Sequence, residues 1–178
     1  QKNLFRGGRY RPLSLVTFSI EYQFFGPNPG VSHLVNVILY GLTCMLLFRV
    51  LAGLFHEKTG SLRFRDYFLS LSLMAALLFA AHPVHTEVVA NIKGRDELMA
   101  LLFGLLAWNS VVRYTDAPRW RHAAYGGLFF FLALLSKESA AVLLVLIPLS
   151  LYCFRDRGIF RKSFRGSVLP LLTGFLLF

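Results

Sequence analysis

Long apolar stretches separated by short polar breaks occupy most of the chain. The stretches cover residues 34–54, 67–81, 98–112, 123–135, 140–154 and 168 to the end. Only the first reaches the roughly 20 residues that an α-helix needs to cross about 30 Å of hydrocarbon. The others are shorter, but they recur in series and are flanked by Lys, Arg and aromatic residues, which suit a membrane interface. The pattern predicts about six membrane spans.

The segment before the first apolar stretch predicts a helix that lies along the outer membrane surface. Residues 11–25 are amphipathic and aromatic, and Pro12 suits a first helical turn. The turn residues Gly-Pro-Asn-Pro-Gly at 26–30 end this helix. We therefore divide the chain into the end of an outer loop, residues 1–31, and a transmembrane helical bundle, residues 32–178. The predicted fold class is all-α integral membrane.

Composition agrees with a lipid environment. The chain has 56% hydrophobic and 16% charged residues, whereas a soluble domain has about 45–50% and about 25%. A net charge of +10 would suggest nucleic acid binding in a soluble protein, but here the basic residues lie between apolar stretches. Lys and Arg in such loops favour the cytoplasmic side of a membrane, so we predict no nucleic acid partner. Cys44 and Cys153 lack the spacing of a metal site.

Ionisable residues gather on the opposite, outer side, next to the ends of predicted spans. They are Glu21, His33, His82, His85, Glu87, Asp96, Glu97, Lys137 and Glu138. Ionisable groups next to membrane segments are candidates for function. The outer face is therefore where we expect chemistry.

The segment after residue 81 has two possible interpretations. His82, His85 and Glu87 could converge on a metal ion or a phosphate, although this is not a known closed metal set. Alternatively, His82 caps a helix end while Glu87 and Arg95 form surface ion pairs. If the chain is helical from Glu87 onwards, Glu87, Asn91 and Arg95 share one helix face.

Two charge clusters next to predicted spans have simple structural explanations as well. Asp96 suits the N-terminus of a helix, where the helix dipole favours acids; Glu97 fits that explanation less well. Lys137 and Glu138 could form a solvated ion pair in a tight turn, or they could belong to a functional site.

Five short motifs carry a family resemblance. They are Tyr10-Arg11-Pro12-Leu13, His33-Leu34-Val35-Asn36, the HPVHTE sequence at 82–87, the GRDEL sequence at 94–98, and Ser136-Lys137-Glu138. In this order they resemble the transmembrane protein O-mannosyltransferases that carry C-terminal tetratricopeptide repeats, and in particular their bacterial members. The resemblance covers nearly the whole chain. Its most specific part is the HPVHTE sequence followed by the GRDEL sequence.

The resemblance implies a GT-C glycosyltransferase bundle whose active site faces the periplasm or lumen. It further implies a polyprenyl phosphate sugar donor, mannose as the usual sugar, and Ser or Thr hydroxyls of a protein as acceptors. The expected membrane is the bacterial inner membrane, or the endoplasmic reticulum in a eukaryote. A catalytic acidic residue, which would be the base of the reaction, and the first membrane helix are expected upstream of Tyr10. The repeats are expected downstream, so the chain is expected to be a fragment.

The resemblance also suggests roles for individual residues. Glu87 and Glu97 are the predicted catalytic residues. The predicted substrate-binding residues are Arg11, His82, His85, Arg95, Lys137 and Glu138, with the basic ones suited to the departing phosphate. A divalent metal ion is a further candidate ligand, held by His82, His85 and Glu87. The alternatives to an enzyme are a membrane-anchored scaffold for tetratricopeptide-repeat interactions and, in third place, a transporter.

Overall fold

A computed structural model describes residues 11–54, 70–154, 168, 171–172 and 174–176, and every regular element among them is helical. The elements with printed bounds are α1 (Pro12–Phe25), α2 (Pro29–Leu54), α4 (Leu71–Ala81), α5 (His85–Ala90), η1 (Ile92–Gly94), α6 (Arg95–Asp116), α7 (Trp120–Ser136), η2 (Glu138–Val142) and α8 (Leu143–Phe154). The predicted all-α class is confirmed for these residues. Residues 1–10, 55–69 and 155–167, together with 169–170, 173 and 177–178 of the last apolar stretch, lie outside the described part.

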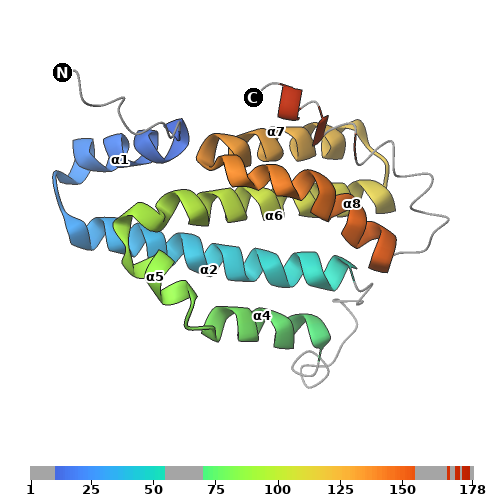
Figure 1. The fold of residues 1–178 in the computed structure, drawn as a ribbon, viewed down its shortest axis with the longest axis horizontal. Coiled ribbons are helices and arrows are strands. Elements are labelled where there is room, and N and C mark those ends of the chain that lie inside the picture. The colour runs from blue at the N-terminus through green and yellow to red at the C-terminus, as the bar shows by residue number, and fades with distance from the viewer. Residues whose placement is uncertain (1–10, 55–69, 155–167, 169–170, 173, 177–178) are drawn as a thin grey trace.

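Helix α6 is the central element of the bundle. It packs most extensively against α7 and α2, and α4 lies on the other side of α2 (Figure 1). Two segments, Pro29–Leu54 and Ile92–Asp116, are long and apolar enough to cross a membrane, and Leu71–Ala81 and Glu138–Phe154 are shorter apolar helices. The predicted number of six spans is not established by these helices.

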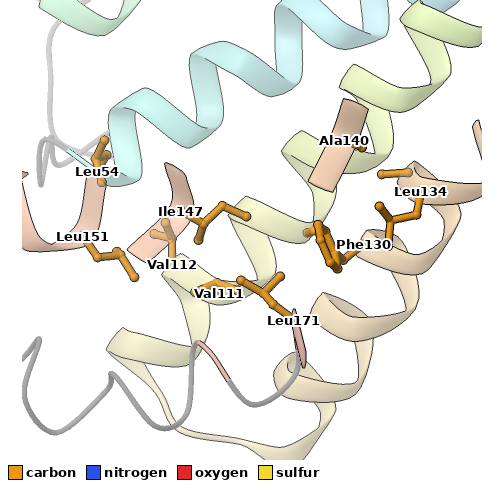
Figure 2. Close-up of a cluster of buried hydrophobic side chains, with 11 residues drawn as sticks. Leu54, Val111, Val112, Phe130, Leu134, Ala140, Ile147, Leu151 and Leu171 are labelled. Atoms are coloured by element: carbon orange, nitrogen blue, oxygen red, sulfur yellow. The ribbon is translucent and has the colours of Figure 1, made fainter. Parts of the chain in front are cut away.

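The hydrophobic core lies between α6, α7 and α8. Phe130 and Ile147 are fully buried there, and Leu171 from near the C-terminus joins them (Figure 2). Small residues let the helices approach closely. A Cβ atom at Gly104 would lie 2.4 Å from Cδ1 of Leu143. This glycine is therefore part of the contact between α6 and α8.

Helix α2 exposes apolar side chains and buries some polar ones. Leu34, Ile38 and Met45 are 58%, 53% and 61% exposed, whereas the polar residues Asn36 and Thr43 are fully buried. Water disfavours a continuous exposed apolar surface of this kind, whereas lipid accepts it. The exposed apolar face and the two candidate spans together indicate a membrane protein.

Helix α1 turns its polar residues towards the bundle. Ser14 and Glu21 are buried, whereas Leu15 and Phe24 are 64% and 75% exposed. The helix ends before Gly26, whose φ of 64° lies in the left-handed region that favours glycine. The interhelical turn is shorter than the predicted one at 26–30, because α2 already begins at Pro29. Proline is tolerated there, since the first turn of a helix needs no N–H donor.

Candidate functional site

Two cavities meet near the N-terminus of α6. The first, which we call the polar cavity, has a volume of about 490 Å³. It is lined by Arg11, Ser14, Leu15 and Phe18 of the α1 region and by Glu87, Val88, Asn91, Lys93, Gly94, Asp96 and Glu97. Three carboxylates and two basic side chains thus surround one space. Such a lining suits a hydroxylated, polar ligand.

The second cavity, which we call the apolar groove, has a volume of about 310 Å³. Its wall is mainly hydrophobic, and its polar residues are Tyr40, His85, Glu97, Lys137 and Ser139. Val88 and Glu97 line both cavities. A ligand with a polar head and an apolar chain could therefore lie across the boundary between them.

The first turn of α6 supplies two of these carboxylates. Asp96 accepts a hydrogen bond from the backbone N–H of Glu97 at 2.8 Å, and it pairs with Arg11, which precedes α1. Both acids lie where the helix dipole favours negative charge. The helix-end interpretation of Asp96 therefore holds, but the residue also connects α1 to the wall of the polar cavity. Its partner Arg11 could not be identified from local sequence.

Lys137 lies on the boundary between the two cavities. Its ammonium nitrogen is 2.6 Å from Oε1 of Glu97, with 23% of the lysine side chain and 48% of the glutamate side chain exposed. The predicted pair between Lys137 and Glu138 is wrong, because Lys137 ends α7 in an extended conformation that directs it towards α6. Glu138 is exposed and lines neither cavity.

Arg95 is fully buried and does not line either cavity. Its guanidinium lies 2.7 Å from Oε2 of Glu21 and donates hydrogen bonds of 3.1 Å to Oδ1 of Asn36 and to the carbonyl oxygen of Ser32. It also stacks 4.0 Å above the ring of Phe18. The surface ion pair that we considered for Arg95 is wrong. This side chain joins α1, α2 and α6, and its role in substrate binding stays a prediction.

The helix that was expected to continue from Glu87 to Arg95 breaks at Asn91. Asn91 has an extended backbone, with φ −83° and ψ 120°, and its side chain accepts a hydrogen bond from the N–H of Lys93 at 3.0 Å. Asn side chains compete with the helix for backbone donors in this way. Glu87 and Asn91 consequently line the polar cavity while Arg95 points into the core. Within the described residues, Glu87 makes no ion pair.

His82 and His85 lie in an aromatic cluster beside a third cavity of about 330 Å³. The ring of His85 packs at a tilt against Phe79, with 4.1 Å between ring centroids, and its centroid lies 5.7 Å from that of Tyr40. Burial lowers the pKa of His85, and nearby His82 lowers it further. His82 is the C-terminal cap of α4, and its Nδ1 accepts a hydrogen bond from Val84 at 3.2 Å.

These positions do not fit a metal ion. Within the described ranges, no group of three or more His, Cys, Asp or Glu side chains is placed to hold one. Glu87 lines the polar cavity, whereas His82 lines the third cavity and His85 lies between the apolar groove and the third cavity. A coordination set needs its ligands within about 2 Å of one ion. The predicted trio is therefore divided between different spaces.

The buried polar partners on α2 were not predicted as part of the site. Ser32 donates a hydrogen bond to Glu21, and the side-chain amide of Asn36 donates one to the carbonyl oxygen of Asn91 at 3.1 Å. A sequence signal for them existed, because Ser32, Asn36 and Thr43 recur at helical spacing within an apolar helix. Polar residues in a membrane helix face the bundle interior.

Comparisons with known proteins identify homologues of this helical segment. The chain is 42% identical over 102 residues to protein O-mannosyl-transferase TMTC4 of Mus musculus, an alignment that covers 56% of this chain and 14% of that protein. It is 34% identical over 142 residues to Tmtc1 of Drosophila melanogaster, covering 80% of this chain and 15% of the relative. It is 32% identical over 168 residues to TMTC2 of Mus musculus, covering 92% and 18%. The chain is homologous to a segment of the protein O-mannosyl-transferases.

The homology supports the predicted relationship only in its broader form. The chain spans 14% to 18% of the length of these protein O-mannosyl-transferases. All three relatives are animal proteins, so they do not support the bacterial-type assignment. No protein-family model matches the chain, and no solved structure matches it significantly.

Proposed function

We propose that this chain forms part of a membrane glycosyltransferase that moves a sugar, mannose in particular, from a polyprenyl phosphate donor to Ser or Thr hydroxyls of proteins. The observation that carries the proposal is the meeting of the polar cavity and the apolar groove at Glu97 and Val88. A lipid-linked sugar has the same two-part chemistry. The homologous proteins are named as O-mannosyl-transferases.

The apolar groove is the proposed site of the lipid donor. Leu98, Leu101 and Leu143 offer hydrophobic contacts to the first isoprene units, and Lys137 stands at the boundary with the polar cavity. An ammonium group in a partly buried position stabilises a phosphate that gains negative charge as it leaves. Lys137 would then exchange its bond to Glu97 for one to the phosphate.

The polar cavity is the proposed site of the sugar and the acceptor hydroxyl. An acceptor Ser or Thr hydroxyl would donate a hydrogen bond to a carboxylate, for which Glu87 is our candidate because it makes no ion pair among the described residues. In the transfer, the acceptor oxygen bonds to the anomeric carbon while the bond from that carbon to the phosphate oxygen breaks. The hydroxyl proton passes to a carboxylate, and the electron pair leaves on the phosphate.

The test uses the full-length protein in membranes with radiolabelled polyprenyl phosphate mannose and a Ser/Thr-rich acceptor. We expect Glu87→Gln to lower transfer by about 100-fold or more and Lys137→Met to lower it with a raised KM for the donor. The matched control is Asp116→Asn, which removes an exposed carboxylate at the opposite end of α6.

The outcomes distinguish a wrongly assigned residue from a wrongly proposed function. Label transferred by the wild type and by Asp116→Asn, but not by Glu87→Gln, would support both. Full transfer by Glu87→Gln would show that the carboxylate is wrongly assigned. If the wild type transfers none of several lipid-linked sugars, the proposed glycosyl transfer is wrong, and the result favours the scaffold alternative.

A further inference from the structure

A separate groove lies between α2 and α6, away from the two cavities of the candidate site. It has a volume of about 330 Å³ and is lined by Leu42, Met45, Leu46 and Arg49 of α2 and by Leu102 and Leu106 of α6. Leu46 forms the floor with 8% exposure, whereas Leu42 and Met45 are 43% and 61% exposed at the rim. Five of its six lining side chains are apolar, and the sixth is a guanidinium.

Arg49 is unusual in its position on a candidate membrane span. It is exposed and makes no ion pair within the described residues. With a rise of 1.5 Å per residue, it lies about 8 Å before the end of α2 at Leu54. A charged side chain on the lipid-facing side of a membrane helix is costly unless an anion or water reaches it. An anionic group near the membrane surface is one partner that would compensate the charge of Arg49.

The direction of the groove identifies the class of that partner. It runs from Leu42, near the middle of α2, to Arg49, a distance of about 10 Å along the helix axis. Its apolar end thus lies towards the bilayer centre and its charged end towards the membrane surface. A phospholipid in that leaflet has the same polarity, with its acyl chain inward and its phosphate outward.

We propose that this groove binds an anionic phospholipid in the leaflet opposite the candidate site, with an acyl chain against Met45 and Leu46 and the phosphate on Arg49. Guanidinium suits a phosphate because it can donate two parallel hydrogen bonds. The site rests on the membrane location of α2 and does not depend on the proposed glycosyl transfer. It differs from the donor site because Arg49 lies at the far end of α2 from Ser32 and Asn36, which both accept hydrogen bonds from Arg95 at the start of α6.

The experiment measures lipid binding to the detergent-purified full-length protein by native mass spectrometry over a lipid titration. The probes are phosphatidylglycerol, phosphatidylcholine and the soluble headgroup analogue glycerol phosphate. We expect the wild type to bind phosphatidylglycerol more tightly than phosphatidylcholine. It should not bind glycerol phosphate, which has no acyl chain to fill the groove. Arg49→Gln should weaken phosphatidylglycerol binding by about tenfold, the equivalent of one charge-assisted hydrogen bond.

Three further variants make the test specific. Arg49→Lys should keep the preference for anionic lipid, because it keeps the charge. Met45→Trp should weaken both lipids, since its larger side chain fills the groove from the rim. Arg113 is an exposed basic residue in the last turn of α6 and does not line the groove, so Arg113→Gln should bind lipid like the wild type.

Two results would overturn the proposal. One is that the Arg49→Gln variant binds phosphatidylglycerol as tightly as the wild type while its thermal stability is unchanged. The other is equal weakening by Arg49→Gln and Arg113→Gln, which would mean that general surface charge, and no defined groove, attracts the lipid.

Discussion

Replacement of Glu21 by Gln tests whether a buried ion pair holds α1 on the bundle. The substitution keeps the size of the side chain and removes its charge. Arg95 senses this change directly, because the residue is fully buried and Glu21 is the acid that its guanidinium contacts. Its other partners, Asn36 and the carbonyl oxygen of Ser32, are neutral. After the substitution, a full positive charge would remain buried among neutral groups.

The size of the effect follows from burial. Loss of one partner of a buried pair typically costs 3–5 kcal/mol, because the other charge is left uncompensated. The pair between Lys137 and Glu97 provides an internal comparison, since it is 23% and 48% exposed. Exposed pairs contribute about 0–1 kcal/mol. We therefore expect Glu21→Gln to lower the free energy of unfolding by about 3 kcal/mol or more and Glu97→Gln by less than about 1 kcal/mol.

The assay is an SDS titration of the full-length protein in mixed micelles, followed by tryptophan fluorescence. Glu21→Gln, Arg95→Met and the double variant form a double-mutant cycle, which isolates the coupling between the two residues. The double variant should be more stable than Glu21→Gln alone, because it buries no uncompensated charge. Equal losses from Glu21→Gln and Glu97→Gln would refute the reasoning, as would a double variant no more stable than Glu21→Gln.

Two further predictions test the segment between α4 and α6. Gly94→Ala would place a Cβ atom 2.2 Å from the carbonyl oxygen of Val88, so we expect a loss of about 1–3 kcal/mol in the free energy of unfolding. Gly41→Ala, whose Cβ meets nothing within 4 Å, should cause no loss in the same titration; equal losses would contradict the steric argument. The second concerns His85, whose pKa lies below its usual 6.5 because of burial first and His82 second. The folded state then binds the proton less readily than the unfolded state, so stability should fall as pH drops below about 6.5. His85→Phe should reduce this fall between about pH 7 and pH 5, and an unchanged pH dependence would disprove the linkage.

The docking of α1 connects stability to the candidate site. Arg11 and Phe18 line the polar cavity, and Phe18 also stacks on Arg95. Loss of the pair between Glu21 and Arg95 should therefore loosen one wall of the cavity. In the transfer assay, Glu21→Gln would then impair activity through the position of α1, although Glu21 itself does not line the polar cavity.

The fold class and the approximate positions of the helices could be predicted from local sequence. The apolar stretches at 34–54, 98–112 and 123–135 fall within α2, α6 and α7, and the turn after residue 25 separates α1 from α2. These features follow from local properties, namely the length of an apolar stretch and the backbone preferences of Pro and Gly. The motifs also identified the related proteins, which the homology supports.

The pairing of the charged side chains could not be predicted in this way, because it depends on how the helices pack. Lys137 pairs with Glu97, 40 positions away, and not with its neighbour Glu138. Arg95 is buried against Glu21, whereas the adjacent Asp96 faces Arg11 and the polar cavity. The local pattern contains the charge of each side chain, but the rotation of a helix about its axis determines its partner. That rotation is set by the packing of α6 against α2 and α7, which depends on residues distant in sequence.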